Sequence, residues 1–355
     1  MRLGPLLTTV ALLAVSACDR QAALTHHRLA AFGTEVTVTL RTDEDADAAV
    51  AAVDRELQMM HRRWHAWEPG LLADVNRALA EGGQIELSAD TLAVIERARE
   101  LERSSNGLFN PAIGRLLALW GFHASELPHG PPPTPAAIEE QVRQAPSMAD
   151  LDIGAGELSS RNRAVQLDFG AYIKGVAVAR ALEILAKHGI EHAIVNAGGD
   201  LGVIGRRGDR PWRAAVEHPD GTGGRYLADL EVRDGEFVFT SGNYRRYRQG
   251  DGIRYGHIID PRDGYPADGV RSVTAITRDG GKADAAATAL AVADVGEWPA
   301  VARKLGVELV MRVGADGLIE ITPAMAARVR WHRQPDRVQV VSLGRGSRSP
   351  AKAHQ

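Results

Sequence analysis

The sequence predicts an α+β fold, and three observations support this prediction. Segments with apolar residues three to four positions apart predict amphipathic helices in both halves of the chain. Short apolar runs bounded by Gly, Asp and Pro predict strands. Helices and strands do not alternate regularly and no segment repeats, so a doubly wound parallel sheet is not expected. The chain has 355 residues with 45% hydrophobic content, enough to bury a large core.

The first half of the chain contains one predicted strand and two long predicted helices. Apolar and threonine residues alternate over residues 35–40, which indicates a half-buried strand. A helix follows over residues 45–63, and a second begins with Ser88 or Asp90 as its N-cap. Residues 123–146 include three consecutive prolines and few large apolar side chains. We expect a surface excursion there, with one short helix at its end.

The second half begins with a strand, turn, helix, strand pattern. The strand is predicted over residues 165–169, the helix over residues 174–188 with Gly189 ending it, and the next strand over residues 193–196. Further strands are predicted over residues 213–216, 227–232, 237–240, 272–277 and 307–313, and two late helices over residues 283–293 and 298–305. Beyond residue 331 the composition is rich in Arg, Lys, Ser and Pro, so residues 332–355 are predicted to form a disordered basic tail.

The N-terminus has the features of an export signal. Arg2 precedes a short apolar run, and small residues lead to Cys18, the single cysteine of the chain. Val-Ser-Ala-Cys resembles a bacterial lipobox, in which the cysteine is acylated and becomes the mature N-terminus. A lone cysteine cannot form an intramolecular disulfide, which favours an anchor over the alternative of an ordinary cleaved signal followed by a chance cysteine.

These features predict how the chain is divided into segments and where in the cell the protein is located. We expect residues 1–17 to be a lipoprotein signal peptide, residues 18–28 a tether and residues 29–331 one folded domain. Asp19 after the anchor resembles the retention signal of Gram-negative inner-membrane lipoproteins, which predicts a lipid-anchored protein on the periplasmic face of the inner membrane. The net charge of −3 provides no broad basic surface, so nucleic acid is not an expected partner.

Asp284 and Thr288 form a candidate site for a hard cation. They lie four residues apart on a predicted alanine-rich helix, so both oxygens project from the same face. Mg²⁺ is commonly held by one or two carboxylates, with carbonyls, water and substrate phosphate completing its shell. The alternative is that Asp284 caps the helix and Thr288 is a core residue.

Lys174 is a candidate phosphate ligand. Asp168 precedes a glycine turn into a predicted helix whose first turn carries Lys174, and a helix N-terminus with a nearby ammonium favours phosphate. Strand-glycine-helix turns are common, however, and many lysines are merely solvated. The segment from Asn196 to Asp200 contains two glycines like a phosphate loop, but it lacks the Lys-Ser/Thr pair and is interpreted as a tight connection near the site.

His257 is the candidate catalytic base. It precedes an apolar Ile-Ile pair at the predicted start of a short strand, and Ser241 and Tyr244 lie just upstream. An imidazole in that setting can accept a proton from an attacking hydroxyl near neutral pH. The alternative is a structural histidine that satisfies a buried backbone group.

Several motifs, in this order, resemble the FAD:protein FMN transferases, the ApbE-type flavin transferases of bacteria. The motifs are Phe109-Asn110-Pro111-Ala112-Ile113-Gly114, Leu119-Trp120-Gly121-Phe122, Asp168-Phe169-Gly170-Ala171, Lys174-Gly175, Asn196-Ala197-Gly198-Gly199-Asp200, Thr240-Ser241-Gly242, His257-Ile258-Ile259-Asp260-Pro261 and Asp284 to Thr288. The resemblance covers most of the chain, from Phe32 to Val313. Two departures are visible: Phe32 stands where many members have Met, and Asn243 where acidic residues are common.

The resemblance implies a fold and a set of site residues. The fold is a single compact α+β unit similar to the T-fold, with FAD in a cleft between two lobes. Asp284, Thr288 and the backbone carbonyl of Ala171 would hold Mg²⁺. The flavin contacts would be Phe32, Leu108, Phe109, Asn110, Asp168, Lys174 and Ile258, with Trp67 covering a ring of FAD.

The resemblance also implies an activity. FAD would be the substrate, and FMN would be transferred to a Thr or Ser hydroxyl of a target protein with release of AMP. The expected target is a membrane redox subunit, with His257 assisting the hydroxyl and Lys174 steadying phosphate. Water in place of the hydroxyl would make the protein an FAD pyrophosphatase that forms FMN and AMP. A non-catalytic periplasmic FAD carrier is the alternative from another class.

Overall fold

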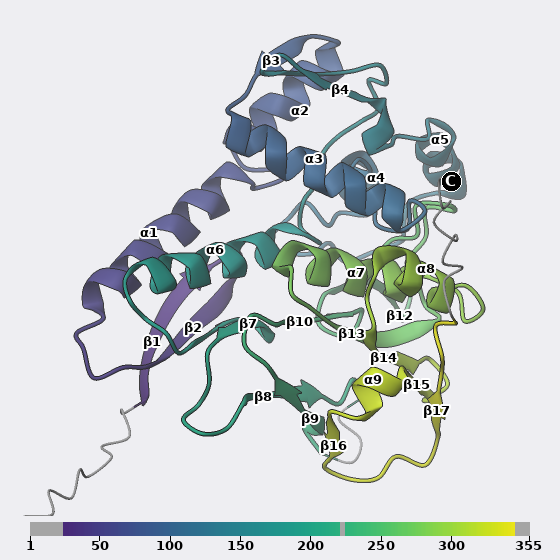
Figure 1. Ribbon diagram of the computed structural model, residues 1–355. Coiled ribbons are helices and arrows are strands. Elements are labelled where there is room, and N and C mark those ends of the chain that lie inside the picture. The colour runs from purple at the N-terminus through teal and green to yellow at the C-terminus, as the bar shows by residue number, and fades with distance from the viewer. Residues whose placement is uncertain (1–23, 221–223, 345–355) are drawn as a thin grey trace, which may run out of the picture.

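A nine-stranded sheet forms the centre of the molecule (Figure 1). The computed structural model describes residues 24–220 and 224–344. The strand order is β1-β2-β6-β7-β10-β13-β14-β15-β17, and every neighbouring pair is antiparallel except β15 and β17. These strands are β1 (Leu24–Ala31), β2 (Thr34–Arg41), β6 (Ala193–Ala197), β7 (Asp200–Ile204), β10 (Phe237–Gly242), β13 (Val270–Thr277), β14 (Leu309–Gly314), β15 (Ile319–Ile321) and β17 (Val338–Val340).

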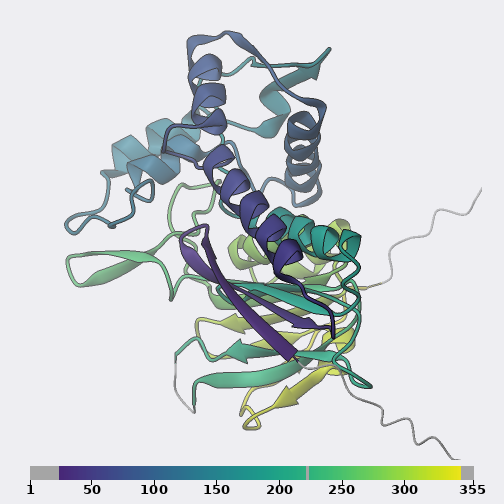
Figure 2. The same ribbon diagram turned by 90° about the vertical axis from the view of Figure 1, so that its left-hand side faces the viewer.

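Helices cover one face of this sheet and a smaller sheet covers the other (Figure 2). The helical layer contains α1 (Asp47–Arg63), α6 (Ile173–Lys187), α7 (Gly280–Val292) and α8 (Trp298–Leu305), and the smaller sheet contains β8 (Trp212–Glu217), β9 (Tyr226–Val232) and β16 (Val329–Trp331), with α9 (Pro323–Ala326) leading into β16. Alternation along β10 sets the two cores: Phe237 and Phe239 pack under the helices, whereas Val238 packs toward the smaller sheet.

A second, mainly helical lobe lies above α6 and α7 in Figure 1. It contains α2 (Leu71–Glu81), α3 (Ala89–Ser104), α4 (Gly114–Leu119), α5 (Pro135–Arg143) and a small sheet of β3 (Gln84–Glu86), β5 (Glu157–Ser160) and β4 (Leu151–Gly154). A separate hairpin, β11 (Tyr247–Gly250) and β12 (Ile253–Gly256), leads directly into His257. Residues 168–172 lead into α6, so this segment meets the helical layer.

The expected α+β class is confirmed, as are most of the long elements. The strand at residues 35–40 and the helices at residues 45–63 and 174–188 form within one to three residues of the predicted limits. Ser88 caps α3, because its side chain accepts a hydrogen bond from the Thr91 N–H. Residues 123–146 contain one short helix near their end, as predicted. No helix in the described ranges is long and apolar enough to cross a bilayer.

Three predictions about irregular segments are wrong. Residues 165–169 form no strand; Gln166 makes only an isolated bridge with Ile113, and the segment is an extended loop buried between the lobes. Residues 24–28 of the expected tether belong to β1, which pairs along its whole length with β2. The expected tail is ordered as far as residue 344, because β17 adds to the edge of β15. The last part of that tail, residues 345–355, lies outside the described residues.

Candidate functional site

Glycines allow the N-terminal ends of α6 and α7 to meet. A Cβ at Gly175 would lie 2.0 Å from the Gly280 carbonyl oxygen, and one at Gly280 would lie 2.3 Å from the Gly175 carbonyl oxygen. Only glycine therefore permits this backbone contact without displacement. The contact brings Asp284 beside the first turn of α6, where the Gly175 N–H donates to Asp284 Oδ2 at 3.1 Å.

Four side chains near this contact form what we call the acidic end of the site: Lys174, Asp200, Asp284 and Thr288. The Lys174 ammonium pairs with the Asp200 carboxylate, which also accepts the Thr240 N–H at 2.9 Å. The Thr288 hydroxyl lies 3.1 Å from the Ser241 hydroxyl. The Gly-Gly turn between β6 and β7 thus places an acid next to Lys174, and the interpretation of Asn196 to Asp200 as a tight connection is confirmed.

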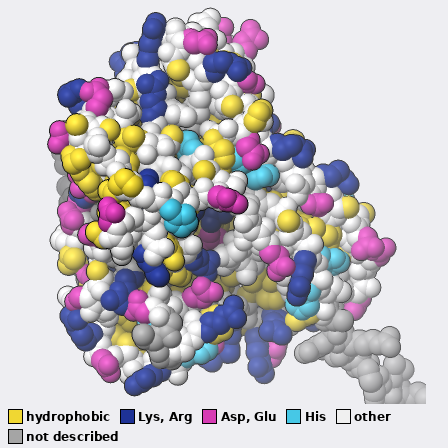
Figure 3. All heavy atoms as spheres, turned by 180° about the vertical axis from the view of Figure 1, so that it is seen from behind, with side chains coloured by type: hydrophobic (Ala, Val, Ile, Leu, Met, Phe, Trp, Pro, Cys, Tyr) yellow, Lys and Arg dark blue, Asp and Glu magenta, His cyan; other side chains and the backbone are white. Residues whose placement is uncertain are grey.

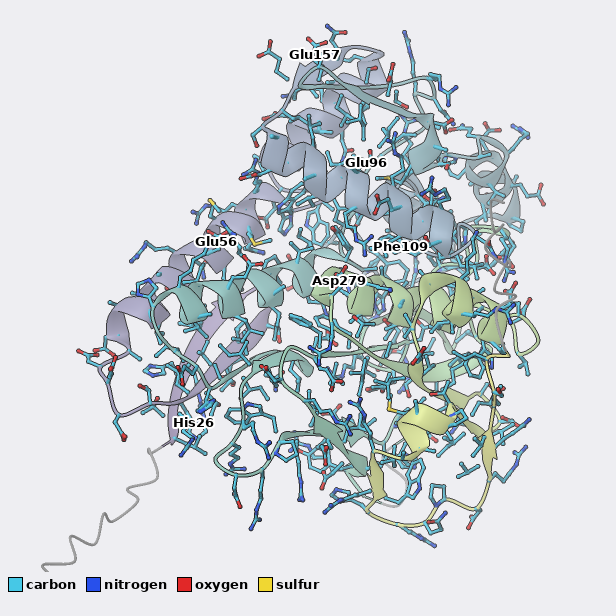
Figure 4. All side chains as sticks on the ribbon, viewed as in Figure 1. His26, Glu56, Glu96, Phe109, Glu157 and Asp279 are labelled. Carbon is cyan, nitrogen blue, oxygen red and sulfur yellow. The ribbon has the colours of Figure 1, made fainter. Side chains whose placement is uncertain are left out.

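Asp284 is an interior residue of α7 and does not cap it. The N-cap is Asp279, whose side chain accepts the Lys282 N–H at 2.9 Å and which Figure 4 shows at the start of α7. Asp284 is 4% exposed. The alternative that Asp284 serves as the helix cap is therefore wrong, and a buried carboxylate remains to be explained.

The charges of the acidic end are closely coupled. Burial raises the pKa of the Asp284 carboxyl to about 7, although the Lys174 charge opposes this shift. Burial also disfavours the Lys174 ammonium, but the Asp200 and Asp284 carboxylates outweigh that effect and raise its pKa. Three ionisable groups with two negative charges and one positive charge therefore share a buried site. An added cation would favour the ionised form of Asp284.

This donor set fits Mg²⁺. Asp284 keeps one carboxylate oxygen free of the Gly175 bond, Thr288 adds a hydroxyl one helical turn away, and Ala171 lies in the turn just before α6. All three offer the hard oxygen atoms that Mg²⁺ prefers. Within residues 24–220 and 224–344 no three His, Cys, Asp or Glu side chains cluster as a metal site. Substrate phosphate and water would have to complete the shell.

Asp168, in the loop that leads into α6, belongs to a second group of residues. Its Oδ1 accepts the Gly170 N–H at 2.7 Å, and its Oδ2 lies 2.8 Å from His123 Nε2. Burial opposes ionisation, but the hydrogen bond and charge of His123 lower the pKa of Asp168 below its ordinary value. Asp168 is therefore an ionised hydrogen-bond acceptor at neutral pH.

We call the second group the aromatic end: Trp67, His123, Asp168, Arg246 and His257. The Trp67 and His123 rings are stacked, with centroids 5.3 Å apart and an interplanar angle of 22°. The Arg246 guanidinium lies 5.7 Å from the centroid of the Trp67 ring. Trp67 is 36% exposed, so part of the indole is available to a flat ligand. Figure 3, which views the molecule from behind relative to Figure 1, shows a hollow with histidine, basic and acidic side chains around it.

His257 follows β12 and is held by Arg246, the residue just before β11. Its Nδ1 lies 3.0 Å from the Arg246 carbonyl oxygen. Because a carbonyl can only accept, Nδ1 carries the hydrogen and Nε2 of the neutral ring has a free lone pair. Burial and the Arg246 charge lower the pKa of His257 to about 4. The ring is therefore neutral at physiological pH, with Nε2 able to accept a proton.

The other predicted flavin contacts differ in burial and in hydrogen bonding. Leu108 and Phe109 are 3% and 2% exposed and belong to the main core, so a role in binding would fall to their main-chain atoms. Asn110 accepts the Ala112 N–H and donates to the Pro146 carbonyl. Ile258 is buried, and Phe32 lies in the β1–β2 turn with φ of 53°, a conformation that costs energy for a residue other than glycine.

Sequence reasoning missed three residues of the site. Asp200 was noted only as part of a turn, although its acidic side chain next to two glycines was a usable signal. His123 and Arg246 carry no local motif, and only the folded chain brings them to Trp67. A cavity of about 750 Å³ lies elsewhere, among α3, α4, α5 and Arg262. It includes Asn110 but none of the acidic or aromatic end, so we do not place the chemistry there.

Comparison with solved structures supports the fold at moderate identity. The crystal structure of the ApbE protein from Thermotoga maritima matches with a TM-score of 0.79 and 29% identity, covering 87% of this chain and 100% of that one. The flavin transferase ApbE from Vibrio cholerae matches with a TM-score of 0.76 and 27% identity, covering 86% and 99%. The single compact α+β unit expected from the sequence is thereby confirmed.

Comparison with curated proteins identifies the family. A protein from Rhodobacter capsulatus named FAD:protein FMN transferase is 42% identical over 84% of this chain, and one of the same name from Treponema pallidum is 34% identical over 61%. The chain spans 57% and 63% of the lengths of these two relatives. The model of the ApbE family matches residues 32–311. The chain therefore belongs to the ApbE family.

Proposed function

We propose that this protein transfers FMN from FAD to a Thr or Ser hydroxyl of another protein in a Mg²⁺-dependent reaction that releases AMP. The observation that carries the proposal is the buried pairing of Asp284 with the first turn of α6, next to Lys174. Membership of a family whose relatives are named FAD:protein FMN transferase supports the reaction class.

The acidic end would bind the pyrophosphate of FAD. Asp284, Thr288 and the Ala171 carbonyl would hold Mg²⁺, which supplies positive charge against the phosphate oxygens when bound. Lys174 would contribute a second positive charge, since its raised pKa keeps it protonated. The N-terminal turn of α6 already donates its Gly175 N–H to the Asp284 carboxylate, and the positive end of the helix dipole favours negative charge nearby. Trp67, at the aromatic end, would stack on a ring of FAD.

The transfer step needs a proton acceptor near the target hydroxyl. The acceptor oxygen would attack the phosphorus on the FMN side of the pyrophosphate, and its proton would move to His257 Nε2. The bond from that phosphorus to the bridging oxygen would break, and AMP would leave with that oxygen. The product is FMN joined to the protein through a phosphoester. The free lone pair of Nε2 supports this role for His257.

One incubation separates transfer from its two alternatives. Purified protein is mixed with FAD, Mg²⁺ and a peptide that carries a candidate acceptor threonine, and a matched peptide with valine at that position is the control. Transfer gives a fluorescent threonine peptide and AMP, with no fluorescent valine peptide. An FAD pyrophosphatase gives free FMN and AMP with either peptide. A carrier binds FAD and releases neither product, which would contradict the proposed enzyme.

The proposal includes export and lipid anchoring at the periplasmic face of the inner membrane, where a membrane redox subunit would be the acceptor. Cys18 and the signal peptide of residues 1–17 lie outside the described residues, so this part rests on the sequence. Cys18→Ser should move the protein from the membrane fraction to the soluble periplasmic fraction. A variant that stays in the membrane fraction, beside an unprocessed wild type, would contradict lipidation.

A further inference from the structure

His123 joins two residues that the proposed flavin site uses for different contacts. Its ring stacks on Trp67, and its Nε2 lies 2.8 Å from Asp168 Oδ2. Trp67 comes from the segment after α1, Asp168 from the loop before α6, and His123 from the loop after α4. The His123 and Asp168 side chains are only 8% and 11% exposed. The His123–Asp168 pair is therefore largely shielded from solvent, whereas the Trp67 ring beside it is partly exposed.

The direction of the hydrogen bond follows from the charge of Asp168. The lowered pKa of Asp168 keeps the carboxylate ionised, so it can only accept. His123 Nε2 must therefore carry the hydrogen and donate it. A bond of this kind to a charged acceptor is stronger than one between neutral groups. It orients the imidazole ring and, through the stack, limits the orientation of the indole.

The backbone on both sides of His123 is also held. Arg246 donates to the carbonyl oxygens of Phe122 and Ala124, at 2.7 Å and 3.2 Å. The same guanidinium lies next to the Trp67 ring. The loop after α4 has no helix or strand of its own at this point, so these bonds and the buried Phe122 side chain fix where His123 lies.

We propose that His123 is a positioning residue that holds the Trp67 ring and the Asp168 carboxylate in the geometry that binds FAD. The inference rests on the proposed function, because it takes FAD as the ligand. A ring already fixed for stacking loses less freedom when FAD binds. Asp168 has further lone pairs beyond those used by Gly170 and His123, and these can accept a donor group of the ligand. His123 thus acts on affinity for FAD and not on the transfer step.

Three substitutions separate stacking from hydrogen bonding. His123→Ala removes both contacts, His123→Phe keeps a ring but cannot donate, and His123→Gln can donate but has no ring. His65→Ala is the matched control. The His65 ring also contacts Trp67, in an edge-on arrangement with the ring centroids 4.4 Å apart, but among the described residues His65 makes no hydrogen bond to Asp168. FAD affinity is measured by flavin fluorescence without any acceptor, and kcat and KM for FAD are measured by transfer to the acceptor peptide.

We expect His123→Ala to raise the Kd and KM for FAD about tenfold while kcat changes by less than about threefold, as for loss of a binding interaction. His123→Phe and His123→Gln should each fall between wild type and His123→Ala, and His65→Ala should stay close to wild type. Unchanged FAD affinity in His123→Ala would overturn the proposal. So would a loss confined to kcat, or an equal loss of affinity in His65→Ala.

The test of His123 can be told apart from the test of the proposed function. If His123→Ala does not fold, as judged by thermal melting, the Phe and Gln variants decide: wild-type affinity in both overturns the proposal. If the wild type binds FAD but does not transfer FMN, the proposed transfer fails, whereas the Kd series still tests the role of His123. A wild type that does not bind FAD would overturn both.

Discussion

The two ends of the candidate site are built in different ways. The acidic end depends on two glycines that let α6 and α7 touch, and its charges are buried and paired with one another. The aromatic end gathers single residues from five separate loops and leaves the Trp67 ring partly exposed. The acidic end is therefore organised to hold charge, and the aromatic end is organised to fit a flat ring.

This difference in construction predicts a difference in function. Two carboxylates near one ammonium leave the acidic end short of positive charge, which suits a metal ion and phosphate. The aromatic end presents a neutral imidazole and an indole, which suit proton transfer and stacking. Damage to the acidic end should therefore abolish the reaction, whereas damage around Trp67 should mainly weaken binding.

The largest effect is expected for Asp284→Ala. The variant loses the buried carboxylate that accepts the Gly175 N–H, so transfer should fall below detection at any Mg²⁺ concentration. Asp284→Asn is the matched control for shape, since it can still accept the Gly175 N–H but carries no charge. Activity is followed by fluorescence of the flavinylated peptide. Substantial Mg²⁺-dependent transfer by either variant would remove the acidic end from the chemistry.

His257→Ala should reduce transfer on the order of a hundredfold, the usual scale of general base catalysis, and should leave FAD binding nearly unchanged. The pH profile sharpens the assignment. With a pKa of about 4, His257 stays neutral down to about pH 5, and only below about pH 4 should its protonation slow transfer. The measurements are kcat from about pH 3 to pH 8 and FAD affinity by fluorescence. A variant that unfolds or loses FAD in step with activity would return His257 to a structural role.

Mg²⁺ should stabilise the protein more at high pH than at low pH. The folded Asp284 binds a proton more tightly than the unfolded chain, with a pKa of about 7 against 3.8. The metal-free protein should therefore lose stability as pH rises from about 4 to about 7. Metal binding to the ionised carboxylate should recover this loss, raising Tm by several degrees at pH 8 and by little at pH 5.

Thermal melting with and without Mg²⁺ at the two pH values checks this expectation. Asp284→Asn is the control, because it cannot titrate and should show no added Mg²⁺ effect at pH 8. An equal rise in Tm at both pH values in the wild type would argue that the ion binds elsewhere.

The smallest effect is expected for Asn243→Asp, which introduces the acidic residue that the family resemblance leads us to expect at this position. Asn243 accepts the Ile258 N–H and donates to the Ala267 carbonyl. Aspartate keeps the first bond but faces the carbonyl with a second acceptor, which should cost about 1 kcal/mol of unfolding free energy. Urea unfolding checks this, with Asn243→Ala, which loses both bonds, expected to be less stable still. A fully stable Asn243→Ala would show that neither bond matters.

Local sequence patterns were sufficient for the long helices and for the acid and hydroxyl of the acidic end. Four-residue spacing puts Asp284 and Thr288 on one helix face in any fold that keeps α7 helical. The same patterns were insufficient at the margins of the sheet. β1 carries His26, His27 and Arg28 in place of an apolar alternation, and β17 has three exposed residues, so each is a strand only because a neighbouring strand offers backbone partners.

Residues 165–169 show the opposite case, because their apolar run predicts a strand but the segment is a buried loop. Its polar groups are satisfied by partners far along the chain, such as Asn76, which both donates to and accepts from the Leu167 backbone. An apolar run indicates that a segment is buried, but a buried segment can be a loop as well as a strand.

The sequence by itself determined which residue types were available: a lone cysteine near the N-terminus, an acid and a hydroxyl one helical turn apart, and a lysine in the first turn of a helix. The tertiary structure decided that Asp279, and not Asp284, caps α7. It also decided that Asp200 pairs with Lys174, and that His123 and Arg246 meet at Trp67. Lys174 and Asp200 are 26 positions apart, and Trp67 lies 56 positions from His123 (123 − 67) and 179 positions from Arg246 (246 − 67). Such contacts depend on how helices and sheets pack, which no local spacing specifies.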